Sequence, residues 1–179
     1  FGADGPNAVT PQSWTLTVGD AVSGLFVTDG SAINLVTVSP TVVVGIVALC
    51  IDMPCFGERS SEIESALAKS LLWQGRTLFG RMLCDLLGAF ALLSAHEGTD
   101  PRRISTFGFS MGATQAFWLG ALEPRLCRIA HACCFADLAM LVKTGAHDLH
   151  GPYMTVPGLL GAFTTGEIAG LAAPRPQLA

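Results

Sequence analysis

The sequence has 179 residues, of which 13% are charged and 50% hydrophobic, with a formal net charge of -4 and a mean hydropathy of +0.50. Its ten lysines and arginines form no basic stripe, which argues against a nucleic acid or another polyanion as partner. The length suits one domain, residues 1–179, and the charged fraction is low where about 25% is usual. Such a composition predicts either a buried parallel sheet or a part of a larger domain whose other elements cover these apolar faces.

The first third of the chain has the pattern of β-strands. Residues 14–27, WTLTVGDAVSGLFV, alternate apolar and polar side chains around Gly19-Asp20, which predicts an antiparallel hairpin in an atypical N-terminal part, residues 1–44. INLVTV, residues 33–38, and TVVVGIVALCI, residues 41–51, predict two more strands. The longer run falls far short of the roughly 20 residues of a membrane helix, so we expect no membrane partner.

The connection between these two strands is too short for consecutive parallel strands. Only Ser39-Pro40-Thr41 separates the two patterns, whereas a parallel crossover needs about a dozen residues. We therefore expect residues 33–51 to hold one long strand broken at Pro40, or two strands that are not neighbours, and no helix.

Two helices follow. Ser60 or Ser61 is a candidate cap for a helix over residues 62–73, with Glu64 in its first turn. Asp52, Glu58 and Arg59 precede it and are expected to fix the turn by hydrogen bonds and an ion pair. A second helix is predicted from about residue 76 to 95, because its apolar residues share one face that we expect in the core: Phe79, Met82, Leu83, Leu86, Phe90 and Leu93.

The second half alternates strands and helices. Residues 103–109 predict a strand, 113–122 a helix and 125–134 a strand, which implies βαβ units and a parallel sheet with right-handed crossovers. Residues 135–170 read as short helices and loops over the site, and residues 175–179 as the start of another strand. The predicted class is therefore α/β, with a mostly parallel sheet.

The junction between strand 103–109 and helix 113–122 carries the clearest chemical motif. Gly108-Phe109-Ser110-Met111-Gly112 fits G-x-S-x-G, the nucleophile elbow, in which small flanking residues let strand and helix approach and the helix N-terminus faces a developing oxyanion. The strand before and the helix after favour a nucleophilic Ser110. The alternative is a glycine-rich turn in which the serine is incidental.

The other chemically versatile residues carry weaker signals. Six cysteines show no C-x-x-C pair and no zinc-like spacing, so we expect small buried hydrophobes in a reducing, cytoplasmic compartment. His96 is expected to cap a helix end and His131 to lie in the core. His147 and His150 flank Asp148 in the segment over the site, so they are the candidate substitute bases, and as a metal site the three are a weak signal.

Several separated blocks together resemble one family. IDMPCFGERS, ESALAKSLLWQGRTLFGRML, DPRRISTFGFSMGATQAFWLGAL, HDLHGPYMTVPGLL and APRPQL are similar, in this order, to the α/β-hydrolase superfamily, specifically its acetyl xylan esterase and dienelactone hydrolase-like branch. The resemblance covers about residues 45–179. It implies helices on both faces of the sheet, Ser110 as acyl-accepting nucleophile, the Met111 N–H as one oxyanion donor, small carboxylic ester substrates, and no cofactor or metal.

Two parts of the family's site have no match. The triad of this fold runs Ser, acid, His, and the strand that leads to the acid begins at APRPQLA, so both partners are expected beyond Ala179 and the domain is expected to be incomplete at both ends. The second oxyanion donor belongs to a loop in the unmatched N-terminal part. The alternative function is therefore a non-catalytic hydrolase-like binding or interaction module, or an inactive fragment, with self-association through exposed apolar faces.

Overall fold

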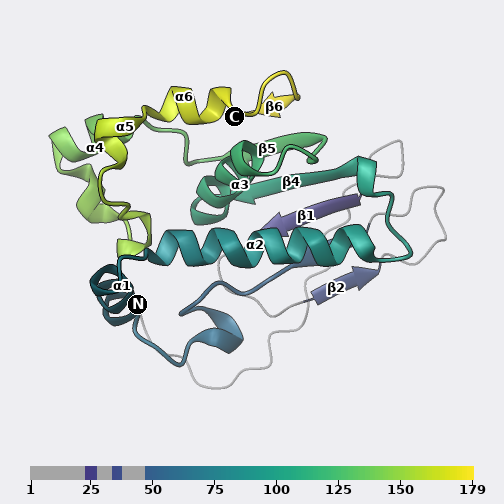
Figure 1. The fold of residues 1–179 in the computed structure, drawn as a ribbon, viewed down its shortest axis with the longest axis horizontal. Helices are drawn as coiled ribbons and strands as arrows, with labels where there is room; N and C mark the ends of the chain where they lie inside the picture. Colours follow the sequence, from purple (N-terminus) through teal and green to yellow (C-terminus); the bar gives the residue numbers. More distant parts are fainter. Residues whose placement is uncertain (1–22, 28–33, 38–46) are drawn as a thin grey trace.

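The computed structural model describes residues 23–27, 34–37 and 47–179, and the side-chain environments of residues 47–179. These residues form a mixed α/β structure around a six-stranded sheet (Figure 1). The strands are β1 Ser23–Val27, β2 Asn34–Thr37, β3 Val47–Cys50, β4 Ile104–Phe109, β5 Arg128–Ala132 and β6 Gln177–Leu178. The helices are α1 Glu64–Trp73, α2 Leu78–Ala95, α3 Met111–Leu122, α4 Leu138–Thr144, α5 Leu159–Ala162 and α6 Thr165–Gly170.

The sheet has the strand order β2-β3-β1-β4-β5-β6, and every neighbouring pair is parallel except β2 with β3. The parallel part β4-α3-β5 is the βαβ unit that the second half of the sequence predicts. The last predicted strand is confirmed as β6, which extends the sheet beside β5.

The structure corrects two predictions about the N-terminal strands. β1 pairs in parallel with both β3 and β4, so its edges are occupied and it is not an arm of an antiparallel hairpin; residues 14–22 of that hairpin lie outside the described residues. β2 and β3 are antiparallel neighbours, with Leu35 opposite Leu49. A parallel connection is excluded as expected, but the broken single strand and the non-neighbouring pair are both wrong, because antiparallel neighbours need no crossover helix. Pro40 itself lies outside the described residues.

The core lies between the sheet and helices α1, α2 and α3. The predicted apolar face of α2 is confirmed, since Phe79, Met82, Leu83, Leu86, Phe90 and Leu93 are all buried. Within the described part of the chain, α2 is the one helix long and apolar enough to cross a membrane by length and composition, a test that core helices of soluble proteins also meet. Here its buried face packs into the same cluster as Ile104 and Leu119.

The described helices cover one face of β4. Its residues alternate, with Ile104, Thr106 and Gly108 buried on the side of α3, and Phe109 60% exposed on the other side. α3 contacts α2 and α6 as well as the sheet, so these helices form one layer (Figure 1). The sequence predicts helices on both faces of the sheet, and this layer on one face is the one that the described residues contain.

The turn after β3 is fixed as predicted, with one change of partner. The Asp52 carboxylate is buried and its Oδ2 accepts the Glu58 N–H at 2.8 Å. Arg59 donates to the Asp52 carbonyl at 3.0 Å and pairs with Asp85 at 2.8 Å, so the ion pair joins this turn to α2 and does not involve Glu58.

Helix α1 begins later than predicted. Its N-cap is Ile63, without a side-chain cap, and Ser60 belongs to the preceding turn. Glu64, in the first turn, accepts the Tyr153 N–H at 3.2 Å and so ties α1 to the segment after α4.

Candidate active site

Ser110 lies in the predicted turn, between the last residue of β4 and the first of α3. Its φ of 53° and ψ of -119° are strained for a residue with a Cβ, and its side chain is exposed. The Ser110 N–H donates to the Ala132 carbonyl at 3.0 Å, which anchors the turn to the end of β5. The hydroxyl is therefore held at the carboxyl edge of the sheet, open to solvent.

Backbone packing explains the glycine before the serine. A Cβ on Gly108 would overlap the Gly112 carbonyl and lie 2.6 Å from the Ala113 nitrogen. Strand and helix therefore meet at a distance that only glycine allows at this position. The close approach predicted for the elbow is confirmed.

The N-terminus of α3 provides a site for negative charge beside Ser110. The Ser110 carbonyl accepts the N–H groups of Ala113, at 3.0 Å, and Thr114, at 3.1 Å. The first N–H groups of a helix have no acceptor within the helix, and Met111 occupies that position. The unpaired N–H groups and the dipole at a helix N-terminus attract negative charge, so Met111 stays the candidate oxyanion donor that the sequence predicts.

Backbone strain is concentrated at this edge. The non-glycine residues with positive φ among those described are Cys55, Ser110 and Cys133, at 75°, 53° and 65°. They follow β3, β4 and β5 respectively, where these strands reach their carboxyl ends. In open α/β sheets this is the edge that binds ligands, and strain of this kind collects at functional sites.

Two of the four histidines, His96 and His131, lie where the sequence predicts. His96 caps the end of α2, is exposed, and accepts the Gly98 N–H at 3.1 Å. His131 is buried in β5, with Nε2 2.9 Å from the Gln177 amide nitrogen and Nδ1 3.9 Å from Cys134 Sγ. Burial lowers its pKa, so it is a neutral core histidine at pH 7.

His147 and His150 lie at a 3-10 helix, Ala146–Leu149, that follows α4. Both are exposed, and within residues 47–179 neither side chain has a hydrogen bond or an ion pair, to Ser110 or to any other residue. No group of three or more His, Cys, Asp or Glu side chains is placed to hold a metal ion in the described part of the chain. The structure therefore brings neither histidine together with the nucleophile.

The cysteines differ from the prediction of small buried hydrophobes. All six are free thiols, Cys84 and Cys133 are exposed, and the other four are partly exposed. Short apolar runs predict burial only where an element is covered on all sides, whereas Cys84 lies on the exposed side of α2 and Cys133 follows the end of β5. Burial raises the pKa of the Cys134 thiol to about 11.

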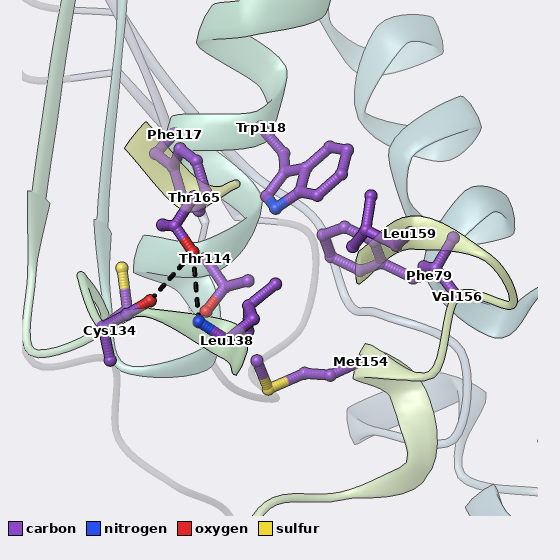
Figure 2. A pocket seen from close by; sticks show the side chains of 11 residues that line it. Phe79, Thr114, Phe117, Trp118, Cys134, Leu138, Met154, Val156, Leu159 and Thr165 are labelled. Carbon is purple, nitrogen blue, oxygen red and sulfur yellow. Dashed lines mark hydrogen bonds between the residues drawn. The ribbon is translucent and has the colours of Figure 1, made fainter. Parts of the chain in front are cut away.

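A narrow hollow beside the elbow was missed by sequence reasoning. Thr114 and Cys134 line it near the serine turn, and Phe79, Trp118 and Leu159 line it farther away (Figure 2). These residues lie far apart in the sequence, on α2, α3, the loop after β5 and α5. Apolar periodicity marks Phe79 as a core residue and carries no sign that these residues share a pocket.

The comparisons with known proteins identify the fold. The solved structure of a protein assigned as an acetyl xylan esterase, from Bacteroides fragilis NCTC 9343, superimposes with a TM-score of 0.72 at 16% identity, over 88% of this chain and 51% of that one. The chain has the α/β-hydrolase fold. A glucuronoyl esterase from Solibacter usitatus matches this hydrolase fold with a TM-score of 0.55 at 14% identity, over 88% of this chain and 54% of the other.

A relative in sequence is also assigned as a hydrolase. The chain is 38% identical over 130 residues to YtaP of Bacillus subtilis (strain 168), a match that spans 73% of this chain and 44% of YtaP. No protein-family profile matches the chain. The chain thus spans about half the length of the proteins it resembles. The predicted α/β class and the likeness to acetyl xylan esterases are confirmed at the level of the fold.

Proposed function

We propose that this chain carries the nucleophile of a serine hydrolase that acts on small carboxylic esters. The observation that supports it most is the position of Ser110, exposed at φ 53° between β4 and α3 at the ligand-binding edge of the sheet. Hydrolases and esterases among the proteins similar in sequence and fold agree with this chemistry. No cofactor is required for it.

The proposed reaction is acyl transfer to Ser110. The Ser110 Oγ attacks the ester carbonyl while a histidine takes its proton, and the Met111 N–H stabilises the tetrahedral oxyanion. The intermediate collapses, the C–O bond to the alcohol breaks, and the histidine returns the proton to the departing alkoxide. Water then hydrolyses the acyl-serine ester by the same steps and releases the acid.

The acid and the histidine are proposed to follow Ala179 in sequence. In this fold they come after the nucleophile in the order acid, then histidine, and the acid follows the strand that corresponds to β6. Within the described residues no carboxylate or imidazole is hydrogen-bonded to Ser110. The 179-residue chain by itself is therefore expected to hydrolyse activated acetate esters barely above buffer.

The test uses Ser110→Ala in a chain that extends past Ala179 through such an acid and histidine. We expect the substitution to remove a readily measured hydrolysis of p-nitrophenyl acetate and the labelling of the protein by a fluorophosphonate. Ser70→Ala is the matched control, because Ser70 is exposed on α1 and its hydroxyl accepts a hydrogen bond from the Gln74 side chain, its one side-chain bond among residues 47–179. Robust turnover of the 179-residue chain, lost on His147→Ala or His150→Ala, would contradict the proposed partners.

The second candidate is a binding module without catalysis, which self-associates through exposed apolar side chains of the sheet. The exposed Phe109 and Leu178, 60% and 70% accessible on β4 and β6, favour it. An extended chain that is inert toward esters and thioesters, and that forms a dimer broken by Phe109→Ser, would support this function over the first.

A further inference from the structure

The hollow beside the elbow lies between α3 and the segment that follows α4. Trp118 and Phe79 line it together with Leu159 and Val156 (Figure 2). Its empty space is about 340 Å³ including the side open to solvent, and the enclosed part holds about one water molecule. It is lined by Phe79, Thr114, Phe117, Trp118, Cys134, Ala136, Leu138, Met154, Val156, Leu159 and Thr165.

The lining is uncharged. It contains no Asp, Glu, Lys, Arg or His side chain, and the Cys134 thiol stays neutral at pH 7 because burial raises its pKa. The Thr165 hydroxyl is already engaged, since it donates to the Ala136 carbonyl at 3.1 Å and accepts the Leu138 N–H at 3.2 Å (Figure 2). A charged group placed here would lose its hydration without a partner, so the hollow suits an apolar group.

The hollow begins close to the nucleophile. Thr114, on its wall, donates its N–H to the Ser110 carbonyl at 3.1 Å, which places it one helical turn from the serine. Cys134 lies two residues after Ala132, whose carbonyl accepts the Ser110 N–H. Helix α3, which carries Thr114, and the end of β5, which precedes Cys134, are therefore each hydrogen-bonded to the turn that carries the hydroxyl.

Side chains of α2, α3 and the segment after α4 line the far side of the hollow. The ring of Trp118 packs edge to face on Phe79, with centroids 5.2 Å apart, which fixes the aromatic side. Leu159 and Val156 come from the segment on the opposite side, and both are partly buried. Their side chains set how far an apolar group can extend away from Ser110.

We propose that this hollow takes the acyl chain of the ester bound at Ser110, and that Leu159 limits that chain to a short, uncharged one. The inference rests on the proposed function. Leu159 acts as a residue that determines specificity, through contact with the end of the acyl chain. Removing its side chain makes room for more methylene groups, each of which gains about fourfold in binding when it is buried.

The kinetic test compares p-nitrophenyl acetate, butyrate and hexanoate as substrates of the extended chain. Leu159→Ala is expected to raise kcat/KM for hexanoate relative to acetate by about 10-fold or more, from at least two additional buried methylenes. Leu149→Ala is the matched control, since Leu149 is 87% exposed and does not line the hollow. Val156→Ala is a second variant should Leu159→Ala fail to fold. An unchanged ratio in the folded variants would overturn the proposal.

A binding test separates the hollow from catalysis. In a Ser110→Ala chain with Trp14→Phe and Trp73→Phe, the emission comes from Trp118 alone, because the sequence has three tryptophans. Titration with propan-1-ol and hexan-1-ol is expected to change this emission, and Leu159→Ala is expected to increase the preference for hexan-1-ol. If Trp118 responds but the extended chain hydrolyses no ester, the apolar site is supported and the proposed function is contradicted. If esters are hydrolysed and Trp118 does not respond, the function is supported and the hollow as acyl site is overturned.

Discussion

Gly108 and Gly112 lie backbone against backbone where β4 passes into α3. A Cβ at position 108 would overlap the Gly112 carbonyl, so no rotation of a side chain can relieve the contact. Strand and helix would have to separate, and Ser110 with its strained φ lies in the turn between them. Glycine is therefore required at position 108 because the strand and the helix leave no room there for a side chain.

We predict that Gly108→Ala lowers the free energy of unfolding by about 1 to 3 kcal/mol or more, the range for overpacking a well-packed core. Gly88→Ala is the control. Gly88 lies in α2, and apart from its chain neighbours and the backbone of its own helix no atom lies within 4 Å of the position that an alanine methyl group would take. Alanine there should add up to about 1 kcal/mol through helix propensity. Urea unfolding measures the free energy of unfolding of both variants. A Gly108→Ala chain as stable as the original would show that the strand and helix can separate freely.

Local features were the ones that the sequence predicted well. The elbow is encoded within five residues, GFSMG, and the buried face of α2 within 18, so neither depends on distant partners. The fixing of the turn by Asp52 was likewise predictable from its position after a strand. The pairing of Arg59 with Asp85 was not, because the two residues are 26 positions apart and nothing in the sequence between them indicates their contact.

Non-local features were the ones that failed. The place of β1 between β3 and β4 follows from strand pairing over long sequence separations. The alternation of apolar and polar side chains along one strand does not indicate which strand it pairs with. The start of α1 at Glu64 was misplaced because Glu64 bonds to Tyr153 of a distant segment and the serines before it do not cap the helix. The hollow unites residues from several elements, which no single periodic pattern reveals.

Arg175 is predicted to hold the end of α3 against the β6 strand. Its guanidinium donates to the carbonyls of Gly120 at 2.6 Å, Glu123 at 2.8 Å and Ala172 at 3.0 Å. Lysine cannot reproduce this fork, so Arg175→Lys should leave carbonyls unpaired and cost about 1 to 3 kcal/mol. Arg102→Lys, at an exposed ion pair with Asp100, should change stability by less than about 1 kcal/mol. Equal effects of the two substitutions in urea unfolding would refute a structural role for Arg175.

His131 is predicted to make stability fall as the pH falls. Burial lowers its pKa in the folded chain, so below the unfolded value of about 6.5 the unfolded state binds more protons and is favoured. The glutamine of His131→Gln cannot be protonated, so the Tm of this variant should fall less between pH 8 and pH 5 than the Tm of the original chain. His96→Gln, at an exposed position, serves as the control. A Tm that declines equally in His131→Gln and the original chain would assign the acid sensitivity to other groups.

Tyr153 allows a direct test of the contact between Thr114 and the segment after α4, because it is the one tyrosine of the sequence. Burial raises the pKa of Tyr153, and a hydrogen bond with Thr114 partly lowers it again. Thr114→Val keeps the side-chain shape and removes the hydroxyl, so the Tyr153 phenol should ionise at a higher pH. Absorbance at 295 nm measures this ionisation over the pH range in which the circular dichroism spectrum stays native. Because the folded pKa is raised, the associated stability is present below the unfolded value of about 10 and is lost as the pH rises above it, and more so in Thr114→Val.

The control for this titration is Thr144→Val, at an exposed threonine of α4 that bonds the Met140 carbonyl, which should leave the midpoint unchanged. A lower or unaltered midpoint in Thr114→Val would mean that the two hydroxyls do not interact. The segment around Tyr153 would then be positioned by its other contacts, the bond from the Tyr153 N–H to Glu64 and the packing of its ring against Phe79 at 6.3 Å between centroids.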